Sequence, residues 1–371
     1  MDVGHSRRAG RRDSHCSGER ICDPPGDREV EMKSTLLPAY APVSTFRSSG
    51  DAHRTTPEQH TLGVVTFTDG WARPRLRDGH PEVGLHLAGS SGDGFAEVWI
   101  SPRPVTGGEF GDITYGHDGE YVFCATHIPE TADYPAATET AYSALLELLT
   151  SLGYPQIFRI WHYMSDINAD SPRGMEVYRE FCVGRAKVLE RHGMSHDMPA
   201  ATVIGARGGG IFLYLLASRG GTQVNIENPR QVPAYHYPSK YGPKSPNFAR
   251  ATYFAPDGPG RIYVSGTAAI LGHQTMHHGD VERQCRLALG NIAQVIGTGT
   301  LSAYDLEPGH GLADLDQIKV YVRRTEDMDR VRRICREYFA PTADIVFLNA
   351  DICRSDLLVE IEGIVARTGS F

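Results

Sequence analysis

The order of apolar and polar positions predicts the same series of elements twice along the chain. The first copy has a strand at 120–127, a helix at 136–152, a strand at 157–164, a helix at 175–191, and strands at 200–206 and 211–217. The second copy has a strand at 261–268, a helix at 280–296, a strand at 317–322, a helix at 328–339, and strands at 344–350 and 357–365. Each copy reads β-α-β-α-β-β after further extended segments. We therefore expect an α+β fold of two tandem units whose sheets pack together.

The last predicted strand carries two carboxylates on one face. Leu358, Glu360 and Glu362 alternate with Val359 and Ile361, so the two sets point to opposite sides of the sheet. Burial disfavours a charged carboxylate, so an inward-facing glutamate has a raised pKa and can donate a proton near neutral pH. An edge strand with both glutamates in water fits the same alternation.

When the two copies are aligned, Tyr214 of the first copy matches Glu360 of the second, and Leu216 matches Glu362. One copy thus retains the carboxylates, as expected of a protein with one specialised site, although random drift would give the same result.

We expect a disordered tail at 1–45, in which Met32 is a candidate start. A degenerate N-terminal domain at 60–220 and a catalytic C-terminal domain at 225–371 follow. The Gly- and Pro-rich segment 220–260 is too long for a plain linker and is expected to line a site.

Composition narrows the class of protein. The 371 residues are 40% hydrophobic and 22% charged, with a formal net charge of −8, which favours neither nucleic acid nor an anionic membrane as partner. No run approaches the roughly 18 apolar residues of a membrane span. The seven cysteines are scattered without a Cys-x-x-Cys pair, which is typical of a reduced cytoplasmic protein.

The segment before the strand at 261–268 contains several cationic and tyrosine side chains. Lys244 and Arg250 lie close to Tyr235, Tyr237 and Tyr241, and such side chains suit a ligand that carries carboxylates. A solvated loop is the alternative interpretation.

Other motifs add little to this picture. Arg185, on the second helix of the first copy, is a further binding candidate, although a surface position is the favoured interpretation. No metal or cofactor is predicted, because His273, His277 and His278 lie in a loop without matching ligands. The glycines at 208–210 precede a strand and not a helix, which argues against a nucleotide loop.

Several segments of the second copy resemble the RidA/YjgF family of small trimeric proteins: 242–245, 262–267, 279–284, 289–292 and 357–364. The duplicated length, segment 228–237 and the spacing from Cys353 to Glu360 resemble a narrower family, the chorismatases, over about residues 60–371. The resemblance implies a monomer that imitates part of the RidA trimer, with a site for chorismate in the cleft between repeats and no cofactor.

The resemblance also ties the product to two small positions. Chorismatases with alanines there hydrolyse chorismate to a dihydroxycyclohexadiene carboxylate and pyruvate, whereas those with Gly and Cys make 3-hydroxybenzoate and pyruvate. The matching residues here are Gly266 and Cys353, so the chain resembles the 3-hydroxybenzoate synthase branch, which commonly supplies secondary metabolism. It implies that Glu360 is the general acid, Glu362 supports it, and a ring hydroxyl attacks intramolecularly. A hydrolytic chorismatase, a RidA-like enamine or imine deaminase and a non-catalytic metabolite-binding protein remain the alternatives.

Overall fold

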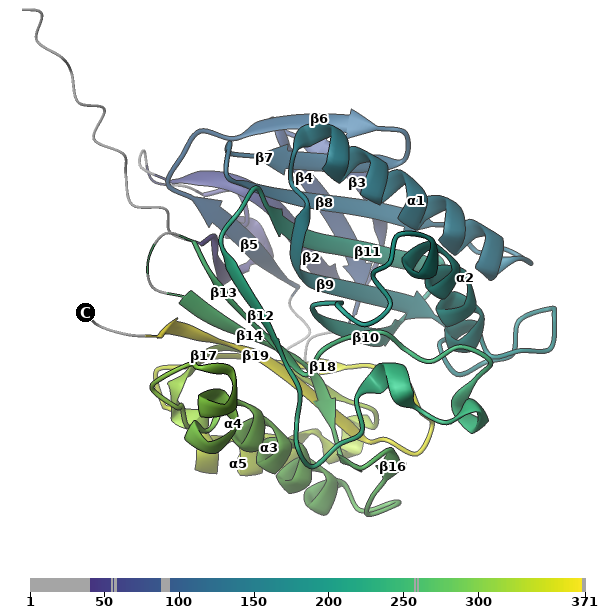
Figure 1. Cartoon of the computed structure of the whole chain (residues 1–371), viewed down its shortest axis with the longest axis vertical. Coiled ribbons are helices and arrows are strands. Elements are labelled where there is room, and N and C mark those ends of the chain that lie inside the picture. The colour runs from purple at the N-terminus through teal and green to yellow at the C-terminus, as the bar shows by residue number, and fades with distance from the viewer. Residues whose placement is uncertain are drawn as a thin grey trace, which may run out of the picture. The chain divides into compact units, whose positions relative to one another are not determined.

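The computed structural model describes residues 41–368, apart from 55, 57–58, 88–93, 257 and 259. Figure 1 shows the sheets and helices of this part of the chain. The first sheet has the strand order β1 (Val43–Ser48), β5 (Phe95–Ser101), β2 (His60–Thr68), β4 (His80–His86), β3 (Ala72–Arg77). The second has the order β10 (Ala200–Ala206), β9 (Gln156–Ser165), β11 (Ile211–Ser218), β8 (Tyr121–Ile128), β7 (Ile113–His117), β6 (Thr106–Phe110).

A third sheet belongs to the C-terminal half. Its order is β12 (Thr222–Ile226), β13 (Ala251–Ala255), β14 (Gly260–Ala268), β19 (Val359–Thr368), β17 (Leu315–Val322), β18 (Asp344–Asn349). The helices are α1 (Tyr134–Leu152), α2 (Val177–Arg191), α3 (Val281–Ile296), α4 (Thr298–Leu301) and α5 (Met328–Tyr338). A hairpin of β15 (Ile270–Leu271) and β16 (Gln274–Thr275) and six short 3-10 helices complete the regular structure of the described residues.

The predicted repeat and the α+β class are confirmed. Element by element, β8-α1-β9-α2-β10-β11 corresponds to β14-α3-β17-α5-β18-β19, and most observed boundaries lie within two residues of the predicted ones. The second and third sheets also have the same strand order when one of them is read backwards. In this correspondence β6 and β7 match β12 and β13, so the repeat includes the extended segments that precede each copy.

The first sheet corrects one expectation from the sequence. Residues 43–45 were assigned to the tail, but they lie in β1, where Val43 pairs with Ile100 of β5. Residues 1–40 of that tail, Met32 included, lie outside the described residues. β12 begins at Thr222 and pairs with β13, and the described residues belong to a single compact unit. The division into domains at 60–220 and 225–371 therefore stays a proposal.

Apolar side chains divide into layers. Helices α1 and α2 pack on the second sheet, and α3 and α5 pack on the third, as Figure 1 shows. The helical spacing predicted for α3 is confirmed, since Cys285, Leu289, Ile292 and Ile296 are fully buried against the third sheet. A further cluster draws large side chains from all three sheets, among them Phe67, Trp99, Trp161, Tyr214, Tyr263 and Tyr321. The three sheets thus share one interior.

The terminal strand β19 lies in the middle of its sheet, between β14 and β17. Glu360 and Glu362 are 4% and 3% exposed, which excludes the edge-strand interpretation. The expected facing of Leu358 is wrong, because the strand begins after it and Leu358 packs with Val359 and Ile361 under the helices.

The pairing register does not confirm the predicted alignment of the two copies, because Tyr214 corresponds to Glu362 when residues are counted from the starts of β11 and β19. Tyr214 stands opposite Trp161, and Leu216 stands opposite Arg159. Glu360 stands opposite Tyr321, and Glu362 stands opposite a lysine, Lys319.

A buried network of charges connects the three sheets. Lys319 Nζ lies 2.9 Å from Glu97 Oε2 of β5 and 3.0 Å from Glu362 Oε1 of β19. Arg159 Nη2 of β9 lies 2.5 Å from Glu362 Oε2, and Tyr214 donates to Glu97 at 2.7 Å. Burial alone would lower the pKa of Lys319, but the two carboxylates raise it above its ordinary value. All four charged groups are therefore paired, as desolvated charges must be.

We predict that Lys319→Met destabilises the protein by about 3–5 kcal/mol, because it leaves buried carboxylates without their cation. Chemical denaturation should show the loss as a lower midpoint. Lys187→Met, which breaks an exposed pair with Glu139, is the control and should change the free energy of unfolding by less than about 1 kcal/mol. Adding Glu97→Gln to Lys319→Met should recover part of the stability. Equal effects of the two lysine substitutions would contradict this account.

Candidate active site

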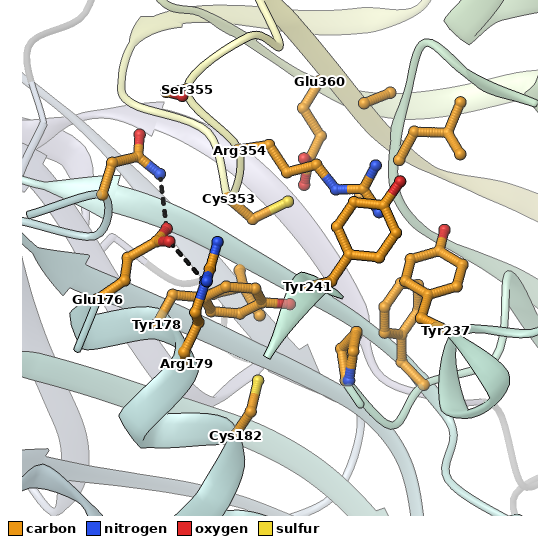
Figure 2. Close-up of a pocket in the computed structure, with 18 of the residues that line it drawn as sticks. Glu176, Tyr178, Arg179, Cys182, Tyr237, Tyr241, Cys353, Arg354, Ser355 and Glu360 are labelled. Carbon is orange, nitrogen blue, oxygen red and sulfur yellow. Dashed lines mark hydrogen bonds and ion pairs between the residues drawn. The ribbon is translucent and has the colours of Figure 1, made fainter. Parts of the chain in front are cut away.

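A cavity of about 340 Å³ lies between the two repeats, within the size range of small-molecule sites. Figure 2 shows side chains from α2, the segment after β12 and the loop before β19 pointing into it. Its lining residues are Asn168, Glu176, Tyr178, Arg179, Cys182, Ala201, Val203, Tyr237, Lys240, Tyr241, Lys244, Pro246, Phe248, Arg250, Gly266, Ala268, Ile270, Cys353, Arg354, Ser355, Asp356 and Glu360. The structure thus brings together most of the residues that the sequence singled out.

The carboxyl group of Glu360 opens into this cavity and is uncharged at neutral pH. Burial, followed by the nearby charge of Glu362, raises its pKa to about 8. No hydrogen bond joins this carboxyl group to another described side chain or backbone group, so no fixed donor favours its anion. A protonated acid placed in this way can deliver its proton to a ligand.

Glu362, two residues further along the same face, is in the opposite state. Its carboxylate accepts from Arg159, Trp161, Thr202, Lys319 and Tyr321, which come from three different strands, β9, β10 and β17. Burial alone would raise the pKa of Glu362, but Lys319 and Arg159 reverse this effect and hold it below its ordinary value. The fixed negative charge helps to keep the neighbouring acid protonated.

Gly266 allows the acid to reach its position. A Cβ atom on Gly266 would overlap Oε1 of Glu360 and lie 2.9 Å from its Cδ. The strand is irregular here, because the register between β14 and β19 shifts between Val264 and Thr267. The N–H of Gly266 donates to Thr202 Oγ1 at 3.0 Å, and the same hydroxyl bonds Glu362. Any larger residue at this position would displace the carboxyl group of Glu360.

Cys353 lines the same cavity from the loop that precedes β19 (Figure 2). Burial, and then the proximity of Glu360, raise the pKa of its thiol. The side chain is therefore a neutral thiol at physiological pH, which argues against a thiolate nucleophile. It can still shape the cavity and pass a proton.

Arg250 is buried at the wall of the cavity. Its Nη2 donates to the hydroxyl of Tyr237 and to Val232 O, both at 2.9 Å. Its Nε lies 3.9 Å from Glu227 Oε2, and burial raises the pKa of that glutamate to about 7. These contacts hold the guanidinium group at the cavity, where it can bind a carboxylate.

Arg354 is a cavity cation that sequence reasoning missed. Its guanidinium lies 3.9 Å from the ring centroid of Tyr241, and its Nη1 donates to His273 O at 2.9 Å. Figure 2 shows its side chain beside Tyr241 and Glu360. Its position directly after Cys353 is the signal that could have revealed it.

The structure changes the predictions for two further candidate binding residues, Lys244 and Tyr235. Lys244 lines the cavity but pairs with Glu190 at its exposed edge. Tyr235 is not among the lining residues, since its ring packs against His196 with centroids 5.3 Å apart. Tyr235 is therefore corrected from a candidate binding residue to one outside the cavity lining.

Arg185 does not lie at the surface position that was favoured for it from the sequence. It is only 3% exposed, so the surface interpretation is wrong. Its side chain donates to Asn247 O and lies over the ring of Tyr142, 5.6 Å from the centroid. It does not line the cavity either, and its visible contacts are structural.

The described residues lack two features of other protein classes. No group of three or more His, Cys, Asp or Glu side chains in that part of the chain is arranged to hold a metal ion. None of its helices combines the length and apolar character that a membrane crossing requires.

Comparisons with known proteins agree with one another. Residues 97–217 match the family model described as "Chorismatase FkbO/Hyg5-like, N-terminal". A 3-hydroxybenzoate synthase of Streptomyces hygroscopicus is 52% identical over 87% of this chain and 97% of its own length. A chorismatase of the same organism is 44% identical over 91% and 98%. A crystal structure of a chorismatase superposes with a TM-score of 0.85 at 46% identity, over 88% of this chain and 98% of that one.

The raised pKa of Glu360 predicts a pH-dependent effect on stability. The folded protein holds this proton to about pH 8 and the unfolded chain only to about 4.5, so the contribution of Glu360 to stability falls as pH rises between these values. Glu360→Gln should match the wild type near pH 5 and exceed it by a few kcal/mol near pH 9, at about 1.4 kcal/mol per pKa unit.

Thermal and chemical denaturation at several pH values measure this difference. The exposed Glu326→Gln is the matched control and should follow the wild type throughout. A constant difference between Glu360→Gln and wild type would show that Glu360 has an ordinary pKa.

Proposed function

Because this chain belongs to the chorismatase family, we propose that it converts chorismate to 3-hydroxybenzoate and pyruvate. One observation carries the proposal: a buried, uncharged Glu360 lies against Gly266 and faces the cavity beside Cys353. The 52% identity to a 3-hydroxybenzoate synthase over nearly its whole length supports this product.

Substrate binding follows from the charges at the cavity. Chorismate carries two carboxylates, and Arg250 and Arg354 line the cavity on different elements. The hydroxyl of Tyr237 already accepts from Arg250, so its own proton is free to donate to a carboxylate. We assign the two arginines to the two substrate carboxylates and expect Tyr237 and Tyr241 to fix their geometry.

Proton transfer from Glu360 starts the reaction. The acid protonates the methylene carbon of the enolpyruvyl group, whose double-bond electrons form the new C–H bond. The neighbouring ring hydroxyl attacks the ring carbon that bears the ether. The C–O bond breaks, and its electron pair completes the keto group of pyruvate. The hydroxyl proton returns to Glu360, directly or through the thiol of Cys353, and the epoxide opens and loses a ring proton to become aromatic.

Exclusion of water decides between the two known types of product. 3-Hydroxybenzoate and pyruvate together contain the atoms of chorismate, whereas the dihydroxycyclohexadiene carboxylate requires an added water. Holding the ring hydroxyl in attack geometry and keeping water away therefore favour the aromatic product. Gly266 makes room for Glu360 close to β14, and Cys353 fills the space beside the acid.

Three further features are part of this proposal. The enzyme acts as a monomer, in the cytoplasm, with a degenerate domain at 60–220 and a catalytic domain at 225–371. Its composition, with scattered cysteines and a moderate negative charge, supports the location. The cavity takes its lining from both repeats within one chain, which supports the monomer.

Wild-type protein should release equal amounts of pyruvate and 3-hydroxybenzoate from chorismate, and Glu360→Gln should reduce pyruvate release by about 10²–10⁴-fold. For the wild type, kcat/KM should fall as pH rises above about 8, because the acid loses its proton there. A coupled pyruvate assay and the ultraviolet spectrum of the product measure both effects. The control is Glu326→Gln. Full activity of a folded Glu360→Gln variant would refute the acid assignment, and turnover of an imine with chorismate untouched would favour a deaminase.

The double substitution Gly266→Ala with Cys353→Ala should shift the product toward the dihydroxycyclohexadiene carboxylate. The new methyl group displaces the carboxyl group of Glu360, and removal of the thiol opens space for water beside it. Chromatography of the products gives their ratio. Gly290→Ala, in the open interior of α3, is the matched glycine control and should leave the ratio unchanged. Exclusive formation of 3-hydroxybenzoate by the double variant would argue against the proposed branch.

A further inference from the structure

The loop of residues 351–357 carries four of the cavity-lining residues, Cys353, Arg354, Ser355 and Asp356, and lies between the repeats. On one side it meets β10 of the first repeat, where Gly205 N–H donates to Asp351 O at 2.8 Å. Ile352 forms an isolated bridge with Ile204 of the same strand. A Cβ atom on Gly205 would lie 2.6 Å from Asp351 Cβ, so the close approach requires glycine.

On its other side the loop is held at Asp356 by Gln284 and Thr275, which donate at 2.9 and 3.1 Å, and along most of its length by Arg323. Arg323, just after β17, donates to five acceptors: Leu357 O at 2.7 Å, Ile352 O at 2.8 Å, Arg354 O at 2.9 Å, Asp351 Oδ1 at 2.5 Å and Asn168 Oδ1 at 3.1 Å. Four of these acceptors lie in the loop and one lies in the first repeat. Nε and Nη1 each donate to one acceptor, and the two N–H groups of Nη2 are shared among the other three, so every nitrogen of the planar guanidinium group is engaged.

The contacts of Arg323 continue into the cavity wall. Asn168, which accepts from Arg323, donates to Glu176 Oε1 at 3.3 Å. Glu176 in turn pairs with Arg179 at 2.9 Å. All three of these partners line the cavity, whereas Arg323 itself does not. Arg323 thus connects the loop of Cys353 to the opposite wall of the cavity without access to a bound ligand.

We propose that Arg323 is a positioning residue that determines the product: by fixing the 351–357 loop, it holds Cys353 and Arg354 against chorismate and keeps water from the reacting ring carbon. This inference rests on the proposed function. A loosened loop leaves Glu360 in place on its central strand, so cleavage continues. It lets water compete with the ring hydroxyl, which converts part of the product into the hydrolysed form.

The test measures the ratio of the two products from chorismate at saturation, together with total pyruvate. Arg323→Lys keeps the charge but has at most three donors, and Arg323→Gln removes the charge. Both variants should raise the ratio of dihydroxycyclohexadiene carboxylate to 3-hydroxybenzoate by about ten-fold or more, since small displacements in a site have effects of this size. The neighbouring Arg324→Gln, whose side chain is exposed, is the matched control and should keep the wild-type ratio.

The outcomes separate the inference from the proposed function. If wild-type protein releases no pyruvate, the proposed function and this inference both fail. If it forms 3-hydroxybenzoate and the Arg323 variants keep its product ratio, only the inference fails. Asp351→Ala removes one acceptor at an exposed position and serves if both Arg323 variants fail to fold. It should move the ratio in the same direction by a smaller factor, and an unchanged ratio in every folded variant overturns the inference.

Discussion

The desolvation of two glutamates on one face of β19 is the constraint on which the rest of the structure depends. Glu360 and Glu362 are both buried, and a charged carboxylate without partners is strongly disfavoured in such surroundings. The protein meets the constraint in two ways. Glu362 stays charged because β9, β10 and β17 supply it with cations and donors, whereas Glu360 stays protonated because nothing comparable reaches it.

This division of roles requires all three sheets. Arg159 comes from the second sheet and Lys319 from the third, and Glu97 of the first sheet shares the lysine with Glu362. Among the described residues, no α-helix lies between the strands of the first sheet and none of its residues lines the cavity, yet its Glu97 balances the lysine that fixes Glu362. Its contribution to the acid is therefore indirect and passes through the charge network.

The repeat could be predicted from sequence because its signals are local. Apolar periodicity marks each helix and each buried strand, and α3 shows it at every turn. The signal is uneven in the first sheet: β2 carries a buried apolar run, but β3 has arginines at 73, 75 and 77, and its pairing with β4 is set by tertiary contacts. Within the site, the burial of Glu360 required the sheet order, which pattern alone leaves open.

The direction of individual side chains explains where the site in the structure differs from the site predicted from the sequence. Gly266 and Cys353 were singled out through family resemblance, and the structure supplies the physical reason for the glycine, namely its contact with Glu360. Arg354 was missed and Tyr235 was wrongly included, because the direction of a side chain in a loop depends on distant partners such as His273 and His196. Sequence spacing does not report such contacts.

The duplication explains how one chain can hold an acid and its support together. In the first copy, the hydroxyl of Tyr214 donates to Glu97 in the charge network. A second glutamate there would add a buried negative charge that the present cations do not balance. The tyrosine therefore completes the network that fixes Glu362, and the charge of Glu362 helps to keep Glu360 protonated.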